Sequence, residues 1–182
     1  MTTPVRMLAR LRVPLGFVFA VAELWLAQPT RASLGWGALI AGIGEALRIW
    51  AAGHLTKSRE VTMSGPYRWM AHPLYVGSSV MGAGLAIASH SVSVAVVIAV
   101  YLGATLTAAV RSEEAFLRER FGDGYDGYRR GDPARRGTRR FSVSLAIANR
   151  EYRAVTGLLL AVLLLALKAT YNGVFWRAGA GR

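Results

Sequence analysis

Five stretches of the chain are rich in apolar residues, and shorter polar segments separate them. They cover residues 13–28, 33–55, 73–88, 92–110 and 154–172. A helix of ~20 apolar residues crosses the hydrocarbon core of a bilayer, and the 38 residues from Pro73 to Val110 include no Asp, Glu, Lys or Arg. The pattern predicts a single all-α domain over residues 1–182. We expect a polytopic membrane helix bundle of about five transmembrane helices, with a cytoplasmic cofactor-binding segment at 111–153.

The third and fourth stretches predict a helical hairpin. Only Ser89, His90 and Ser91 separate them, and so short a connection makes the two helices antiparallel neighbours. A further short apolar run, Phe141 to Ala148, cannot cross a bilayer. Its alternation suits a strand and its flanking arginines suit an interfacial helix, so both interpretations stay open.

Positive charge is distributed unevenly between the two sides of the predicted bundle. The chain has 22 Lys and Arg against 10 Asp and Glu, and seventeen of the basic residues fall on the side of the N-terminus against four on the other. The positive-inside rule then places the N-terminus in the cytoplasm of an integral membrane protein, for example of a bacterial inner membrane. Because the basic residues lie between apolar spans, no nucleic-acid partner is expected. A cleaved signal peptide is the alternative interpretation of the first stretch.

Some polar residue types exclude or suggest particular chemistry. There is no Cys, and the three histidines lie eighteen residues apart, so no metal site is expected. Glu45 and Arg48 are three residues apart on one face of the second predicted helix. Charges at membrane depth pair with each other or line a cavity, and a structural ion pair and a functional pair are both open here.

Two polar stretches bracket the hairpin on its cytoplasmic side. Residues 65–77 read GPYRWMAHPLYVG, and residues 111–128 begin RSEEAFL and continue to FGDGYDGY. Pro73 suits the first turn of a helix and keeps His72 out of it. Because the hairpin returns the chain to its starting side, the two stretches are expected to meet in one pocket.

The motifs in these stretches resemble the isoprenylcysteine carboxyl methyltransferase family and its phospholipid N-methyltransferase relatives. The resemblance covers roughly residues 45–130 and is carried by GPY at 65–67, HPxYxG at 72–77, EExxL at 113–117 and FGxxYxxY at 121–128. It implies a membrane enzyme that uses S-adenosylmethionine without a Rossmann fold. Arg68 and His72 are the candidates for catalysis. The implied cofactor-binding residues are His72, Tyr75, Gly77, Gly82, Gly84, Glu113, Glu114, Tyr125 and Tyr128.

Each motif also has a purely structural interpretation. Ser78 and Gly82 are four residues apart, as are Gly84 and Ala88. This spacing of small residues suits close helix packing, and packing is the favoured interpretation of the glycine motif alone. Glu113 and Glu114 could be the acidic first turn of a helix capped by Ser112. Adjacent helical residues diverge by about 100°, so one glutamate, preferably Glu114, is expected to face the cofactor.

The resemblance implies a lipophilic or lipid methyl acceptor in contact with membrane lipids. Carboxyl O-methylation is preferred, and N-methylation of an ethanolamine phospholipid is the alternative. Ala71 stands where the family commonly has Arg, and the sequence after Tyr128 departs from the family pattern. These departures support another class, a non-catalytic membrane scaffold or lipid-binding protein, whereas Glu23, Glu45 and Arg48 would suit a small transporter.

Overall fold

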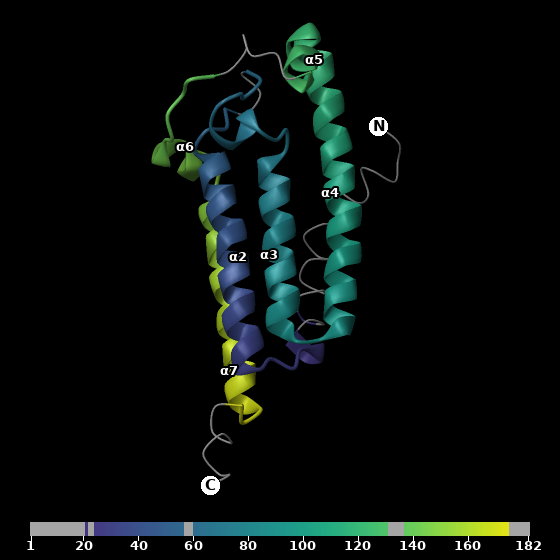
Figure 1. Cartoon of the computed structure of the whole chain (residues 1–182), viewed down its shortest axis with the longest axis vertical. Coiled ribbons are helices and arrows are strands. Elements are labelled where there is room, and N and C mark those ends of the chain that lie inside the picture. The colour runs from purple at the N-terminus through teal and green to yellow at the C-terminus, as the bar shows by residue number, and fades with distance from the viewer. Residues whose placement is uncertain (1–20, 22–23, 57–59, 131–136, 175–182) are drawn as a thin grey trace.

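The computed structural model describes residues 21, 24–56, 60–130 and 137–174, and in these ranges every regular element is a helix. The elements are α2 (Arg31–Ala52), η1 (Gly65–Arg68), α3 (Pro73–Ser89), α4 (Val92–Phe121), α5 (Asp123–Arg129), α6 (Val143–Ala148) and α7 (Tyr152–Tyr171). The four long helices run alongside one another, and η1, α5 and α6 gather at one end of them, here called the polar end (Figure 1). The prediction of an all-α fold is confirmed.

Close packing of α2 on α3 forms the centre of the bundle, and small residues make it possible. A Cβ on Gly84 would collide with the Ala41 backbone and lie 2.6 Å from the carbonyl oxygen of Gly37. A Cβ on Gly44 would lie 2.6 Å from the carbonyl oxygen of Gly77. The backbones of the two helices can therefore approach each other only where side chains are absent.

The predicted hairpin is formed by α3 and α4, but α4 is longer than expected. His90, in the left-handed conformation with φ 49°, ends α3, and Ser91 caps α4. The helix then continues unbroken to Phe121 rather than ending near 110. The interpretation of Ser112 as the cap of a new helix is therefore wrong, because nothing in 111–121 breaks the helix before Gly122, which has φ 45°. Glu113 and Glu114 lie on this extension.

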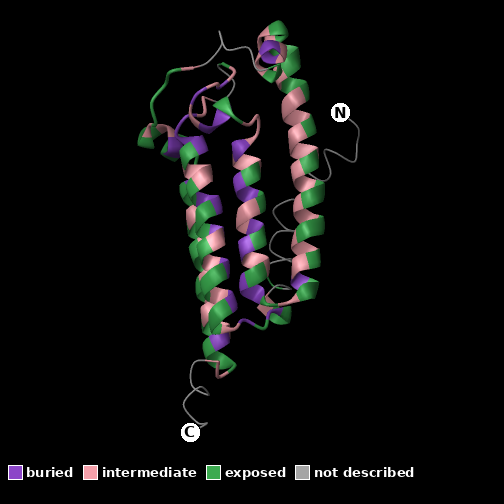
Figure 2. Ribbon diagram, in the orientation of Figure 1, coloured by how far each residue is buried: buried purple, intermediate pink, exposed green. Residues whose placement is uncertain are grey.

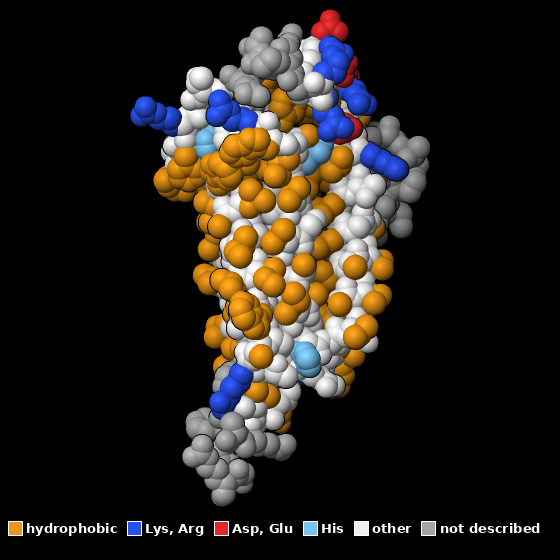
Figure 3. All heavy atoms as spheres, in the orientation of Figure 1, with side chains coloured by type: hydrophobic (Ala, Val, Ile, Leu, Met, Phe, Trp, Pro, Cys, Tyr) orange, Lys and Arg blue, Asp and Glu red, His pale blue; other side chains and the backbone are white. Residues whose placement is uncertain are grey.

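Two of the described helices, α4 and α7, are long and apolar enough to cross a membrane, and α3 is a shorter apolar helix. Large apolar side chains are exposed on them, such as Val100, 67% exposed, and Leu159, 65% exposed. Figure 3 shows hydrophobic side chains spread over the visible face of the helices, and Figure 2 shows how much of each helix is exposed. Such a surface suits lipid rather than water. The first predicted span, 13–28, lies largely outside the described residues, so the five-span topology stays a prediction.

The segment 141–151, which precedes α7, is attached to the polar end of α2. The Asn149 amide donates to the carbonyl oxygens of Ala52 and Leu55 at 2.9 and 2.8 Å, and the Ser142 N–H donates to that of Gly53 at 3.0 Å. The run 141–148 was expected to be either a strand or an interfacial helix. It contains helix α6, so the strand is excluded. Helix α7 then runs back along α2 (Figure 1).

Candidate functional site

The GPY and HP motifs build the corner where the chain enters α3. Pro66 is the second residue of η1 and Pro73 is the first residue of α3. At both positions the N–H that proline lacks would have no partner within the helix. His72 is the N-cap residue of α3, and its ring stacks on that of Tyr75, with centroids 5.6 Å apart. This stacking directs His72 across the polar end, toward α4.

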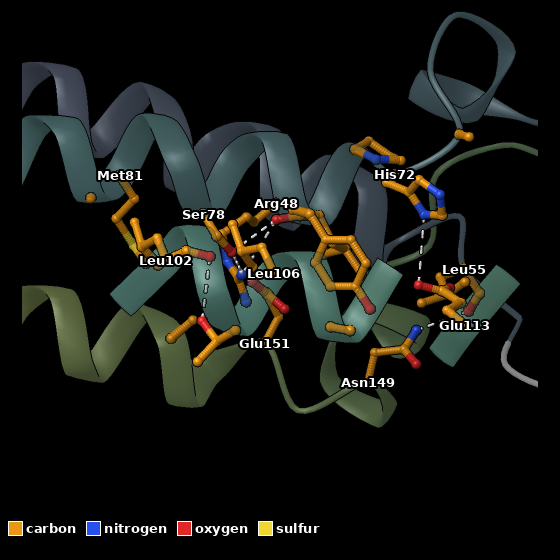
Figure 4. A pocket seen from close by; sticks show the side chains of 18 of the residues that line it. Arg48, Leu55, His72, Ser78, Met81, Leu102, Leu106, Glu113, Asn149 and Glu151 are labelled. Atoms are coloured by element: carbon orange, nitrogen blue, oxygen red, sulfur yellow. Dashed lines mark hydrogen bonds and ion pairs between the residues drawn. The ribbon is translucent and has the colours of Figure 1, made fainter. Parts of the chain in front are cut away.

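The two glutamates of the α4 extension meet His72. Its Nε2 lies 3.2 Å from Oε1 of Glu114, and its Nδ1 lies 3.7 Å from Oε2 of Glu113. Arg129 of α5 also pairs with Glu114, at 3.5 Å. Residues that are about forty positions apart in the sequence thus form one charged cluster, with the arrangement of His72 and Glu113 shown in Figure 4.

The charges in this cluster stabilise one another. Interaction with Glu113, and then with Glu114, raises the pKa of His72 although partial burial opposes it. The contact with His72, supported by Arg129 and Arg118, lowers the pKa of Glu114. A protonated His72 between ionised carboxylates is the arrangement that these shifts favour.

Two tyrosines of α5 complete the polar end. The Tyr128 hydroxyl donates to the carbonyl oxygen of Tyr67 at 2.8 Å, which attaches α5 to η1, and burial raises its pKa to about 12. Tyr125 is 1% exposed, and its buried hydroxyl has no hydrogen-bond partner within the described structure. Because an unpaired buried hydroxyl is costly, this group could gain a hydrogen bond from a ligand in the site.

A cavity of about 790 Å³ connects these groups to the interior of the bundle. Its volume falls within the ~300–1,000 Å³ typical of small-molecule sites. At the polar end, Glu113, His72 and the tyrosine rings line it. Farther in, apolar faces of α3 and α4 form its walls, with the lining residues Leu74, Met81, Leu85, Val94, Ile98, Leu102 and Leu106. The cavity therefore has a charged end and a long apolar part.

Between these two parts, Arg48 holds a second charged group on the cavity wall. Its Nε lies 2.7 Å from Oε1 of Glu151, at the start of α7, and 3.5 Å from Oε2 of Glu45, and it also donates to the Ser78 hydroxyl (Figure 4). Both carboxylates are buried. The sequence paired Arg48 with Glu45 but did not indicate Glu151, which lies a hundred residues away from them.

The structure brings most of the expected site residues to this cavity, but not all of them. Gly77 and Gly84 pack against α2 instead, where a Cβ on Gly77 would lie 2.6 Å from Cγ of Arg48. Arg68 is exposed and, like Glu114, is absent from the cavity wall. Those that line it are His72, Tyr75, Gly82, Glu113, Tyr125 and Tyr128.

The fold and the site together define a class: a helical protein with lipid-compatible surfaces and an ionic cavity at one end of its bundle. The sequence profile of the phospholipid methyltransferase family matches residues 12–124. The chain therefore belongs to the phospholipid methyltransferase family, and its resemblance to this group of membrane methyltransferases is confirmed.

Two curated relatives match over 100 residues, which are 54% of this chain. One is the nickel-cobalt-cadmium resistance protein NccN of Alcaligenes xylosoxydans xylosoxydans, 34% identical over 45% of its own length. The other is the cobalt-zinc-cadmium resistance protein CzcN of Cupriavidus metallidurans, 32% identical over 44% of its length. The match thus spans less than half of each relative. No solved structure matches the chain.

Proposed function

We propose that this protein is an S-adenosylmethionine-dependent methyltransferase that acts on a lipid-borne acceptor at the cytoplasmic membrane face. The family to which the chain belongs supports methyl transfer in general terms. The observation that carries the cofactor assignment is the cluster of His72, Glu113 and Glu114 at a cavity that also contains the unpaired Tyr125 hydroxyl.

The residues at the polar end fit the groups of this cofactor. Carboxylates such as Glu113 accept hydrogen bonds from an ammonium or a ribose diol, and tyrosine rings can face a sulfonium or an adenine. When bound, S-adenosylmethionine supplies an electrophilic methyl group. Glu113 and the Tyr125 hydroxyl would orient it, whereas Glu114 would hold His72 and Arg129 in place.

The shape of the cavity supports a lipid acceptor. Its apolar part lies between α3 and α4, so a hydrocarbon chain could lie along these helices while the reacting head group stays near Glu113. Catalysis then depends mainly on aligning the acceptor atom with the methyl group and on excluding water. The carboxyl O-methylation that we prefer from the motifs requires no proton acceptor.

An amine acceptor is the second candidate, and two observations favour it. The family description names phospholipids, and Glu113 at the charged end would attract an ammonium. An amine must lose a proton before it attacks. His72, which lines the cavity and contacts two carboxylates, is the group placed to take that proton when it is neutral.

Cofactor binding tests the proposal directly. Titration of S-adenosylmethionine into the purified full chain in detergent should give saturable binding, and Glu113→Gln should weaken it about tenfold, as expected for the loss of a charge-assisted contact. Glu119→Gln is the matched control, because Glu119 lies on the same helix, is exposed and does not line the cavity. No binding by the unaltered protein at millimolar cofactor would refute the assignment.

The acceptor requires a separate experiment. Membranes that contain the protein are incubated with cofactor labelled in the methyl group, and the labelled lipid is identified by mass spectrometry. A methylated ethanolamine head group would establish the amine acceptor, and a base-labile methyl ester would establish the carboxyl acceptor.

A further inference from the structure

One wall of the cavity comes from chain that lies beyond the segment matched by the family profile. Asn149, Arg150, Glu151 and Arg153 line the cavity, whereas the profile ends at residue 124. This wall is held firmly, since Asn149 donates to two carbonyl oxygens of the α2 end and Glu151 pairs with Arg48. The backbone of this wall is therefore fixed beside the cavity, and its two arginines, Arg150 and Arg153, are exposed there.

Two positive charges on this wall are not neutralised. The other charged side chains of the cavity lining are paired: Arg48 with Glu151, His72 with Glu113, and Glu60 with Arg139 at 2.8 Å. Within the described parts of the chain, no carboxylate lies within ion-pair distance of Arg150 or Arg153. The Arg153 guanidinium lies 6.0 Å from the centroid of the adjacent Tyr152 ring.

The backbone at Arg150 gives a second observation. Its φ of 62° lies in the left-handed region, which disfavours residues with a Cβ and suits glycine at the end of a helix. The N–H groups of Arg150 and Glu151 close the turn after α6 by donating to Ile147 and Ala146. These bonds use only backbone atoms, so the turn does not need an arginine side chain.

We propose that Arg150 and Arg153 bind the phosphate of a lipid whose hydrocarbon chains lie in the apolar part of the cavity. The proposal rests on the proposed function, because it identifies part of the acceptor at the same site. Guanidinium groups bind phosphate through paired, charge-assisted hydrogen bonds. A lipid is favoured over a soluble phosphate because the same cavity continues along apolar residues of α3 and α4, such as Leu85 and Leu102.

The test compares two lipids that differ only in the phosphate. Binding of dioleoyl phosphatidic acid and of dioleoylglycerol to the full chain in detergent is measured by native mass spectrometry. The variants are Arg150→Gly, Arg153→Gln and the two combined. Arg140→Gln is the matched control, because Arg140 is an exposed arginine near α6 that does not line the cavity.

We expect the double variant to bind the phosphatidic acid about tenfold more weakly or worse, with unchanged binding of the diacylglycerol. Arg140→Gln should change neither, and Arg153→Lys should retain most of the affinity. Arg150→Gly should keep or raise the thermal midpoint, since glycine suits its backbone. Unchanged phosphatidic acid binding, an equal loss for both lipids, or an equal loss in the control would overturn the proposal.

Two further measurements are needed. One distinguishes a lipid phosphate from inorganic phosphate, and the other tests the methyltransferase proposal separately from the phosphate site. If inorganic phosphate binds as tightly as the phosphatidic acid and with the same dependence on Arg150, the lipid part of the proposal is wrong. Cofactor titration of the same samples is independent of the lipid result. Failure of the unaltered protein to bind S-adenosylmethionine would refute the proposed methyltransferase, while the phosphate comparison would still be decided by the lipid titrations.

Discussion

At the scale of single residues, two tyrosines one turn apart on α5 differ in their hydrogen bonding. Tyr128 donates to a backbone carbonyl and thereby attaches α5 to η1. The Tyr125 hydroxyl is buried without a partner in the described structure. Substitutions that remove only an oxygen atom can therefore separate the tyrosine that contributes to the fold from the one that we propose contacts the cofactor.

We predict opposite effects for the two phenylalanine variants. Tyr128→Phe should lower the free energy of unfolding by about 1 kcal/mol, because a buried hydrogen bond is lost. Tyr125→Phe should leave the stability of the ligand-free protein unchanged or higher but weaken cofactor binding severalfold. Thermal unfolding and cofactor titration in detergent measure both effects. A stability loss in Tyr125→Phe equal to that in Tyr128→Phe would show that the hydroxyl has a structural partner.

The ionic contacts of His72 predict how stability depends on pH. Its pKa in the folded protein is raised from 6.5 by the two glutamates, so its contribution is fully present below pH 6.5 and is lost as the pH rises through the raised value. The pKa of Glu114 is lowered from 4.5, so its contribution to stability is fully present above pH 4.5. This contribution is lost as the pH falls through the lowered pKa.

The thermal midpoint of the unaltered protein should therefore decline as the pH rises above 6.5, and His72→Gln should flatten this decline. Unfolding curves measured between pH 6 and pH 8.5 provide the comparison. His90→Gln is the control, because His90 lies in the turn at the opposite end of the hairpin. An identical slope in the unaltered protein and in His72→Gln would contradict the assignment.

At the scale of helices, glycines that look alike in sequence have different roles. Gly37, Gly44 and Gly84 lie where α2 and α3 are in contact, whereas a Cβ on Gly35 or Gly42 would meet nothing within 4 Å. The spacing of these glycines in the sequence is similar, and only the direction in which each faces distinguishes them. The same direction decides that Gly84, expected at the cofactor, lies against α2.

We predict that Gly84→Ala destabilises the protein by about 1–3 kcal/mol, because its methyl group would force α2 and α3 apart. Gly42→Ala should be neutral or stabilising by about 0.5–1 kcal/mol, since alanine favours the helix and has free space there. Thermal midpoints of the two variants in one detergent give the comparison. Equal effects would show that the helix contact is looser than described.

At the scale of the whole molecule, the buried group of Glu45, Arg48 and Glu151 connects three helices. Arg48 on α2 donates to Ser78 on α3 and pairs with Glu151 at the start of α7. It thus joins the segment matched by the family profile to chain outside that segment. A buried charge that loses its partner is strongly unfavourable, so the integrity of the cavity wall depends on this group.

Arg48→Met should destabilise the protein by about 3–5 kcal/mol, because two carboxylates would remain buried without a counter-charge. The triple variant with Glu45→Gln, Arg48→Met and Glu151→Gln should recover much of this loss. Thermal unfolding measures both variants. A triple variant that is less stable than Arg48→Met would show that the carboxylates have other cationic partners.

Topology is also a property of the whole molecule, and the absence of cysteine makes it simple to measure. Single cysteines at Glu119 and at Ser93 lie near opposite ends of α4 and are both exposed. A membrane-impermeant maleimide should label Glu119→Cys only in inside-out vesicles and Ser93→Cys only in right-side-out vesicles. Labelling of Glu119→Cys in right-side-out vesicles would exclude the proposed cytoplasmic polar end, and labelling of both cysteines from one side would exclude a membrane-spanning α4.

The amino-acid sequence by itself determined the helical class, the hairpin of the apolar stretches 73–88 and 92–110, and the meeting of His72 with the twin glutamates. These follow from local chemistry, namely apolar runs, a proline at a helix start and a three-residue turn. Only the tertiary structure decided which glutamate lines the cavity, which glycines pack against α2, and that Glu151 and Arg150 join the site. Those outcomes depend on how each helix is rotated and on contacts a hundred residues apart, which local patterns do not specify.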